Sequence, residues 1–163
     1  KPSSAASDVY KRQDINMVVD NISEFLINNT YRSKFLAIDF GLKNLGLAIS
    51  DQTNLIAIPF KTLSERQLLN EIIEIVESNN IYGIIIGKPY NLDGSDSKMI
   101  VNVNLFIERI LRVQNFPIYL IDERLSSKQY KTSTKISKKG VHEKSACLIL
   151  DDFLALYHNY KND

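Results

Sequence analysis

Five short hydrophobic runs along the chain have no helical period and therefore predict β-strands. They lie at residues 35–40, 45–50, 54–60, 81–87 and 117–122. The first two are joined by the short connection from Gly41 to Asn44, so we expect them to pair as an antiparallel hairpin. The run at 54–60 is expected to end at Pro59, whereas the continuous apolar run at 81–87 is typical of a strand buried on both faces.

Other hydrophobic residues recur at intervals of three and four, which predicts helices. These helices cover residues 18–26, 64–76, 97–113, 123–136 and about 143–157. Ser64, followed three residues later by Gln67, has the pattern of a capping box at a helix start. After the short N-terminal helix, the order of elements predicts an α/β domain in which an antiparallel meander precedes parallel crossover units. Right-handed crossovers would place the last two strands beside the first.

Composition limits the class of protein only loosely. The 163 residues suffice for one domain with a hydrophobic core and are too few for two full ones. The net charge of +1 neither favours nor excludes a nucleic-acid partner. The single cysteine, Cys147, excludes an intrachain disulfide and a cysteine-based metal cluster, and its helical apolar surroundings predict a buried thiol.

The ends of the chain and its hydropathy suggest no membrane segment. No stretch approaches the roughly 18 apolar residues that a membrane span needs. Residues 1–16 are small and polar, lack the apolar core of a signal peptide and do not begin with Met. We therefore expect 1–16 to be a disordered leader or an artefact, Met17 to be the native start, and 17–160 to form a single domain.

Acidic residues follow two of the predicted strands. Asp39 ends the run Phe35–Ile38, and Asp122 with Glu123 follows the last strand. A carboxylate at the end of a central strand is costly unless it is solvated, hydrogen-bonded or bound to a cation. Because ligands of open α/β sheets gather at the carboxyl ends of the strands, these acids can meet at one edge. The alternatives are that Asp39 starts a turn and that Asp122 caps the following helix.

Basic residues are concentrated just after these acids. Seven of them face a single acid, Glu143, in the segment 124–144: Arg124, Lys128, Lys131, Lys135, Lys138, Lys139 and Lys144. Four have helical spacing and would form one ridge, which fits either a solvated helix face or contact with phosphates. Its position beside the acids favours a polyanion, and therefore metal-assisted hydrolysis of phosphodiester bonds without a Ser or Cys nucleophile.

Four segments in order, AIDFGLKNLGLAISD, IIIGKPYNLDGSDS, IYLIDERLSS and EKSACLILDDFL, resemble the YqgF/RuvX family. The resemblance implies a ribonuclease H-like fold: a mixed five-stranded sheet of order 3-2-1-4-5, with strand 2 antiparallel and helices on both sides. It also implies a cytoplasmic bacterial protein. Members are described as Holliday-junction resolvases and as nucleases that mature the 5′ end of 16S ribosomal RNA.

The resemblance also implies roles for individual residues. Asp39 matches the first-strand acid of the family, and Glu123 matches the acid of its D-E-R motif, flanked by Asp122 and Arg124. These acids would hold two divalent ions, Mg²⁺ or Mn²⁺. The implied nucleic-acid contacts are Lys43, Lys88, Arg124, Lys128, Lys131, Lys135, Lys138 and Lys139.

One position departs from the family pattern. Where the family has an Asp at the start of its final helix, this chain has His142. His142 could be a metal ligand, which would favour Mn²⁺ over the oxygen-preferring Mg²⁺. Alternatively, Glu143 reaches the metal from the next position, or the site is weakened and the protein is an RNA-binding relic.

Two other readings concern function and partners. Actin-like ATPases and sugar kinases share the first motif, but they need a second domain that this length cannot supply. The substrate is either RNA, meaning pre-16S rRNA or a ribosomal particle, or branched DNA, and the chain acts as a monomer or a homodimer.

Overall fold

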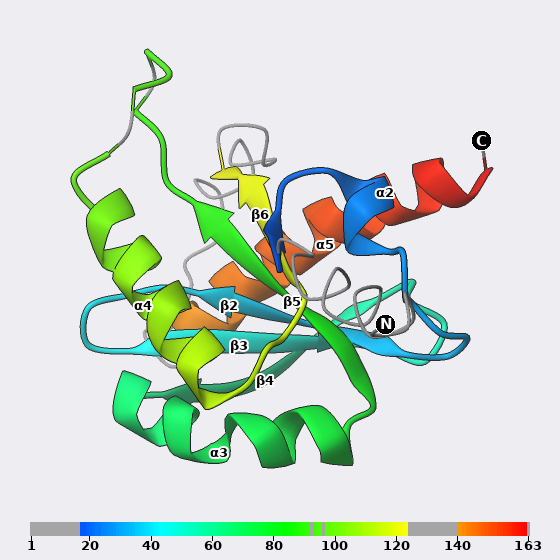
Figure 1. Cartoon of the computed structure of the whole chain (residues 1–163), viewed down its shortest axis with the longest axis horizontal. Coiled ribbons are helices and arrows are strands. Elements are labelled where there is room, and N and C mark those ends of the chain that lie inside the picture. The colour runs from blue at the N-terminus through cyan, green and yellow to red at the C-terminus, as the bar shows by residue number, and fades with distance from the viewer. Residues whose placement is uncertain (1–16, 92, 96, 124–139, 163) are drawn as a thin grey trace, which may run out of the picture.

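The computed structural model describes residues 17–91, 93–95, 97–123 and 140–162, and the predictions for 1–16 and for a helix at 123–136 lie outside them apart from Glu123. Its centre is a six-stranded sheet of order β1-β6-β5-β2-β3-β4 (Figure 1). β3 runs antiparallel to both of its neighbours, and the other strand pairs are parallel. The strands are β1 (Val18–Val19), β2 (Lys34–Asp39), β3 (Leu45–Ser50), β4 (Ala57–Leu63), β5 (Ile81–Lys88) and β6 (Ile118–Asp122).

The five predicted strands have the predicted order and directions, and the class is α/β. The sixth strand corrects the prediction of an N-terminal helix that includes Val18. Val18 and Val19 instead pair with Ile118 and Tyr119 of β6, because β-branched side chains suit an extended edge strand. Helix α2 (Ile22–Phe25) begins only after Asn21, whose side chain accepts hydrogen bonds from two backbone N–H groups.

The third predicted strand also differs from expectation, because β4 continues past Pro59 to Leu63. Proline cannot donate a ladder hydrogen bond, and it is tolerated here for two reasons. β4 is the last strand in the sheet order, and Pro59 lies opposite Ala48, where the pairing register shifts. A proline in an edge strand therefore does not end it.

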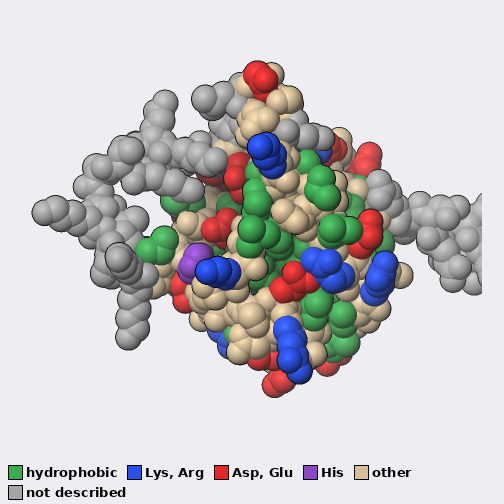
Figure 2. Space-filling model, turned by 90° about the vertical axis from the view of Figure 1, so that its left-hand side faces the viewer, with side chains coloured by type: hydrophobic (Ala, Val, Ile, Leu, Met, Phe, Trp, Pro, Cys, Tyr) green, Lys and Arg blue, Asp and Glu red, His purple; other side chains and the backbone are tan. Residues whose placement is uncertain are grey.

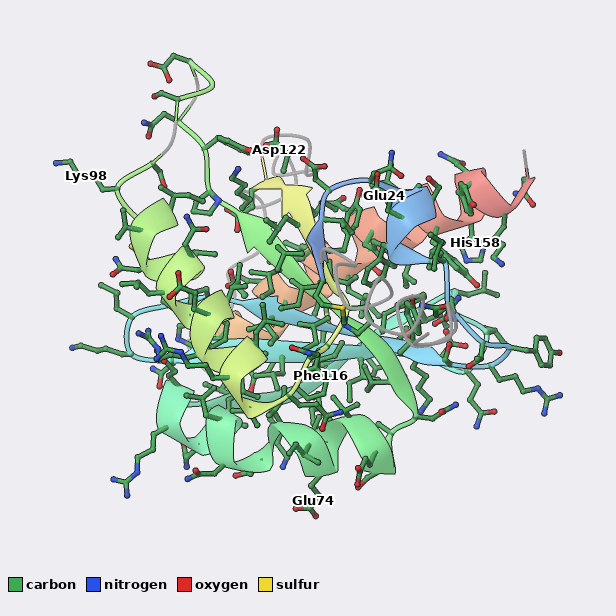
Figure 3. All side chains as sticks on the ribbon, in the orientation of Figure 1. Glu24, Glu74, Lys98, Phe116, Asp122 and His158 are labelled. Carbon is green, nitrogen blue, oxygen red and sulfur yellow. The ribbon has the colours of Figure 1, made fainter. Side chains whose placement is uncertain are left out.

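Helices cover both faces of the sheet. α3 (Glu65–Ser78) and α4 (Ile100–Val113) pack on one face, and α5 (Val141–Asn162) packs with α2 on the other (Figure 1). The capping box of Ser64 and Gln67 is present at the start of α3. The apolar side of α3 faces the sheet, whereas Glu74 points away from the sheet (Figure 3).

Two hydrophobic cores result, one on each face of the sheet. The core beside α3 and α4 is mainly aliphatic, whereas the core beside α5 is centred on aromatic side chains such as Phe25, Phe35 and Phe153. Cys147 on α5 is half-buried rather than fully buried. Among the described helices, none is both long and apolar enough to cross a membrane.

Candidate active site

The first two predicted acids meet at one edge of the sheet. Asp39 is the last residue of β2, and Glu123 directly follows β6. Both line a cavity of about 190 Å³, together with Phe40, Gly87, Pro89, Met99 and Val103. β5 lies between β2 and β6, so two strand spacings, about 10 Å, separate the two backbones. The side chains must therefore bridge the width of β5.

Gly87 of β5 makes this bridging possible. A Cβ atom at Gly87 would collide with the carboxylate oxygen Oε1 of Glu123 and would lie 3.0 Å from both Cγ and Cδ of that side chain. Since ordinary carbon–carbon contacts are about 3.5–4.0 Å, any side chain at position 87 would displace Glu123. The glycine thus leaves room for the Glu123 carboxylate above β5, on the side of Asp39.

A second glycine brings helix α5 to the same edge. Gly46 of β3 is the cross-strand partner of Asp39, so their Cα substituents point to the same face of the sheet. A Cβ at Gly46 would collide with the backbone carbonyl of His142 and would lie 3.0 Å from the backbone nitrogen of Glu143. The first turn of α5 therefore packs directly on the strand beside Asp39, where its positive dipole end favours an anion.

The two candidate ligands on this turn differ in their surroundings. The His142 side chain is exposed, although its backbone lies against Gly46. The Glu143 side chain is partly buried, and its Oε2 atom is buried without a hydrogen-bond partner among the described residues. A buried carboxylate oxygen without a partner is costly, and a bound cation would compensate for it. Of these two residues, Glu143 is the one whose surroundings call for a cation.

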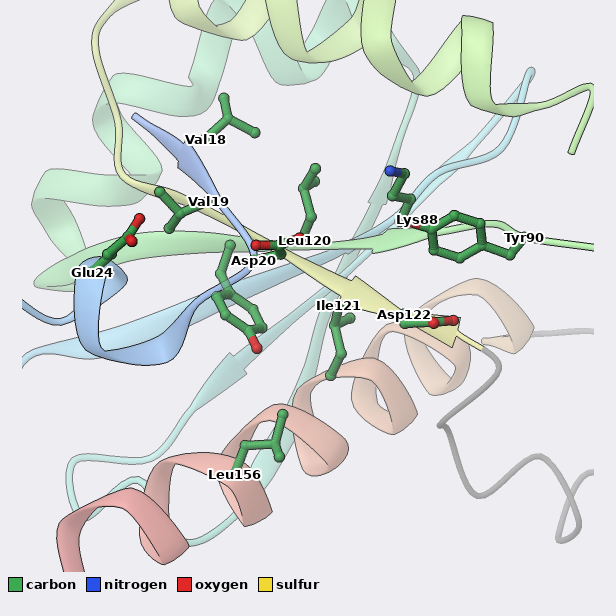
Figure 4. Close-up of a pocket in the computed structure, with 11 residues that line it drawn as sticks. Val18, Val19, Asp20, Glu24, Lys88, Tyr90, Leu120, Ile121, Asp122 and Leu156 are labelled. Atoms are coloured by element: carbon green, nitrogen blue, oxygen red, sulfur yellow. The ribbon is translucent and has the colours of Figure 1, made fainter. Parts of the chain in front are cut away.

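Asp122 and Lys88 belong to a different cavity, of about 440 Å³ (Figure 4). The two residues are register partners on β6 and β5. The ammonium nitrogen of Lys88 lies 4.7 Å from the ring centroid of Tyr90, which also lines this cavity. Asp122 lines this cavity, whereas its neighbour Glu123, which follows the end of β6, lines the cavity of Asp39.

The remaining predicted nucleic-acid contacts are only partly described. Lys43 is exposed in the connection between β2 and β3. That connection is tight, since a Cβ at Gly41 would lie 2.5 Å from the carbonyl oxygen of Asn44. Figure 2 shows the face that carries this connection, where acidic and basic side chains lie next to one another around hydrophobic ones. The other predicted contacts lie outside the described residues: Arg124, Lys128, Lys131, Lys135, Lys138 and Lys139.

Comparison with known proteins identifies the family. The model of the family described as "RuvX: Holliday junction resolvase" matches residues 33–156. The chain belongs to the RuvX family. The match covers β2 to β6 and most of α5, so all the elements that carry Asp39, Gly46, Gly87 and Glu123 belong to it.

Curated relatives of the chain carry the name "Putative pre-16S rRNA nuclease". One from Pelagibacter ubique is 38% identical over 109 residues, which cover 65% of this chain and 72% of the relative. Another, from Maridesulfovibrio salexigens, is 36% identical over 132 residues, which cover 75% of this chain and 98% of the relative. Among solved structures, Thermus thermophilus RuvC in complex with a Holliday junction substrate superposes with a TM-score of 0.57. The two chains share 12% identity, and the match covers 78% of this chain and 96% of that one, so it shows a shared fold.

The RuvX-family site, as described, fits a divalent ion incompletely. Among the described residues, no three His, Cys, Asp or Glu side chains form a group that could hold a metal ion. Two carboxylates at one cavity nevertheless match what Mg²⁺ often takes from a protein, because substrate phosphates and water complete its octahedron. The Oε2 atom of Glu143 is buried without a partner among the described residues, but Glu143 is not among the residues that line the cavity of Asp39 and Glu123. Among the described residues, this cavity thus offers two carboxylates, whose oxygens are the donor type that Mg²⁺ prefers.

Sequence reasoning did not identify the roles of Gly46 and Gly87. A signal existed, since a glycine inside a strand pattern often marks the close approach of another group. A further acid, Asp51, directly follows β3, at the opposite end of that strand from Gly46. Its carboxylate accepts hydrogen bonds from Thr53, Leu55 and Ile56 and stabilises the turn before β4. Asp51 is therefore a turn residue away from the candidate active site.

Proposed function

We propose that this RuvX-family chain is a divalent-metal-dependent nuclease that hydrolyses phosphodiester bonds in 16S ribosomal RNA precursors near their 5′ end. The observation that carries the proposal is the pairing of Asp39 and Glu123 at one cavity, with Gly87 leaving space for the Glu123 carboxylate. A mere turn residue at position 39 would not explain why a second acid from another strand reaches the same cavity.

The proposed metal ligands are Asp39 and Glu123, with Glu143 as the third acid in place of His142. A divalent ion bound there would polarise the phosphodiester and lower the pKa of an attacking water. Asp39 is fixed by its strand, and the Glu123 carboxylate is confined by the surface of β5. The backbone N–H groups at the start of α5 supply positive potential for the scissile phosphate. The chain needs no covalent nucleophile for this reaction.

The proposed substrate rests on the relatives and on charge. The curated relatives are named for pre-16S rRNA, and we propose the same RNA, in the cytoplasm, for this chain. Lys43 lies in the connection that directly follows Asp39, and Lys88 directly follows Gly87. Lys43 would contact a phosphate beside the scissile bond, whereas Lys88 would contact a phosphate of the same strand from the neighbouring cavity that it lines with Asp122.

Two other functions are each favoured by one observation. Branched DNA is favoured by the family description and by the fold shared with a junction-bound RuvC. Cleavage of both strands of a junction would require a homodimer, whereas end trimming needs only a monomer, so the mass in solution separates the two. An RNA-binding relic without activity is favoured by the absence of a three-ligand metal group among the described residues and by the exposed His142.

The decisive experiment incubates the full chain with a 5′-extended 16S precursor and with a four-way DNA junction, each with Mg²⁺ or Mn²⁺. We expect cleavage of the RNA, and Asp39→Asn should lower its rate by about 100-fold or more while RNA binding persists. Glu74→Gln is the matched control, because Glu74 is exposed on α3 and points away from the sheet (Figure 3). Preferential cleavage of the junction would replace RNA by DNA as substrate, and binding without any cleavage would refute the nuclease.

The identity of the third acid is tested separately. If Glu143 is a ligand, Glu143→Gln should weaken Mn²⁺ binding, measured by calorimetry without substrate, by about 10–100-fold. His142→Ala should leave Mn²⁺ affinity unchanged. The opposite result would restore His142 as the ligand.

A further inference from the structure

A hollow lies at the end of the molecule opposite the candidate active site. It measures about 620 Å³, and its lining includes Tyr31, Arg32, Tyr157 and Lys161. We call it the Tyr31 hollow. Asp39 ends β2, whereas Arg32 precedes its first residue, Lys34, so the length of this strand, about 20 Å, separates the two sites.

The lining of the Tyr31 hollow combines positive charge with aromatic rings. The guanidinium carbon of Arg32 lies 5.2 Å from the ring centroid of Tyr31, and the Lys161 ammonium lies 5.8 Å from that of Tyr157. No Asp or Glu is among the described residues that line the hollow. Within the described part of the chain, the salt bridges involve neither Arg32 nor Lys161. Both cations are thus available to an anionic ligand.

The floor of the hollow is rigid. The Asn54 amide donates to the carbonyl oxygen of Ser33 at 2.9 Å and accepts from the hydroxyl of Ser50 at 2.6 Å. The ring nitrogen Nε2 of His158 lies 2.7 Å from the carbonyl oxygen of Asn54, which ties α5 to the same turn. Three distant segments are therefore fixed to one another beneath the exposed residues, and Figure 3 places His158 at this end of the molecule.

The exposed residues, by contrast, have no structural task that the described contacts reveal. Tyr31 is 88% exposed, and Arg32 has a left-handed backbone with φ of 65°. That conformation costs energy for a non-glycine residue and is held by Asn80, whose side chain donates to the carbonyl oxygen of Arg32 at 3.2 Å. An exposed aromatic residue on a firmly held turn is a preformed surface for stacking.

We propose that the Tyr31 hollow binds a single-stranded segment of the nucleic-acid substrate, with a base stacked on Tyr31 and phosphates at Arg32 and Lys161. Sites for single strands characteristically join aromatic platforms to cations in this way. At about 3.4 Å per stacked nucleotide, the hollow would hold a base about six nucleotides from the scissile bond. The inference rests on the proposed nuclease function, because it assigns a place to the strand flanking the cleaved bond.

The test measures binding apart from cleavage. The full chain is titrated with a labelled 12-nucleotide RNA in EDTA, by fluorescence anisotropy at several salt concentrations, and with the DNA of the same sequence in a second arm. Tyr31→Ala should weaken binding about tenfold. The double variant Arg32→Ala/Lys161→Ala should reduce the salt slope by about 1.4, since each cation contributes about 0.7 on a single strand.

The matched control is Arg66→Ala, because Arg66 is an exposed arginine on α3, on the other face of the sheet. If Tyr31→Ala and Arg32→Ala/Lys161→Ala lose no more affinity than this control, the Tyr31 hollow is not a strand site. The proposed nuclease function would be unaffected by that result. Polyglutamate serves as a competitor, and a hollow that binds it but not the oligonucleotides would be a protein interface, which also overturns the proposal. Equal losses on RNA and DNA support a strand site without sugar discrimination. If the chain binds single strands but never cleaves them, the proposed nuclease function is refuted. The proposal that the Tyr31 hollow holds the strand flanking a cleaved bond is then refuted with it.

Discussion

The substitution Gly87→Ala tests the geometry of the candidate active site most directly. The new Cβ would lie 3.0 Å from Cγ and Cδ of Glu123 and would collide with Oε1. Restoring normal contacts of about 3.5–4.0 Å requires the carboxylate to move by about 1 Å. A misplacement of this size costs a catalytic group about 100-fold in rate, equivalent to about 2.7 kcal/mol of transition-state stabilisation.

Stability should hardly change in this variant. The displaced atoms are the end of a flexible side chain, so the free energy of unfolding should change by less than about 1 kcal/mol. Gly46→Ala is the informative comparison, because its Cβ would collide with the backbone of His142 and force α5 to shift. That variant should lose about 1–3 kcal/mol of stability as well as activity.

The assay is the rate of RNA cleavage under single-turnover conditions, together with urea unfolding followed by circular dichroism. Gly87→Ala should therefore separate activity from stability, and Gly46→Ala should not. Cleavage by Gly87→Ala at the rate of the unchanged protein would refute the placement of Glu123 at the reacting phosphate.

Three further predictions concern pH, packing and thiol reactivity. Partial burial acts to raise the pKa of Asp51, but hydrogen bonds from the Thr53 hydroxyl and three backbone N–H groups lower it to about 2, from 3.8. Its stabilisation is therefore complete above about pH 4 and lost as pH falls towards 2, and acid titration of Asp51→Asn should show a smaller loss. Phe25 is only 2% exposed and packs against the rings of Tyr82 and Phe153. Phe25→Ala should therefore lower the free energy of unfolding, measured by urea titration, by about 3–5 kcal/mol. Burial, reinforced by nearby carboxylates, raises the pKa of Cys147 to about 11, so iodoacetamide should label it slowly at pH 7 and faster as pH rises; rapid labelling at pH 7 would contradict this.

Local patterns predicted much of the fold because the signals lay close together in sequence. The capping box at Ser64 and the hairpin around Gly41 each need only a few neighbouring residues. β1 could not be found this way, because Val18 and Val19 are extended only through pairing with a strand about 100 residues later. Pro59 misled for a related reason, since whether it ends a strand depends on the position of that strand in the sheet.

The candidate active site likewise has features that the sequence predicts and features that depend on tertiary packing. The positions of Asp39 and Glu123 after two strands predicted their shared edge, and the structure places both at one cavity. The choice between His142 and Glu143 is not visible in sequence, because it depends on which side chain the packing of α5 on Gly46 buries. The roles of Gly46 and Gly87 could not be predicted either, because each leaves room for atoms from a distant segment of the chain.

The contribution of α5 to both the aromatic core and the acidic edge has a consequence for biosynthesis. A growing chain emerges from its N-terminus, and α5 follows all the other described elements along it. An incomplete chain that ends before residue 140 already contains Asp39 and Glu123 but lacks the helix that covers one face of the sheet. Native packing on that face, and the turn that carries Glu143, form only after α5 has been synthesised. The chain thus assembles its proposed cleavage site only after α5 has been made.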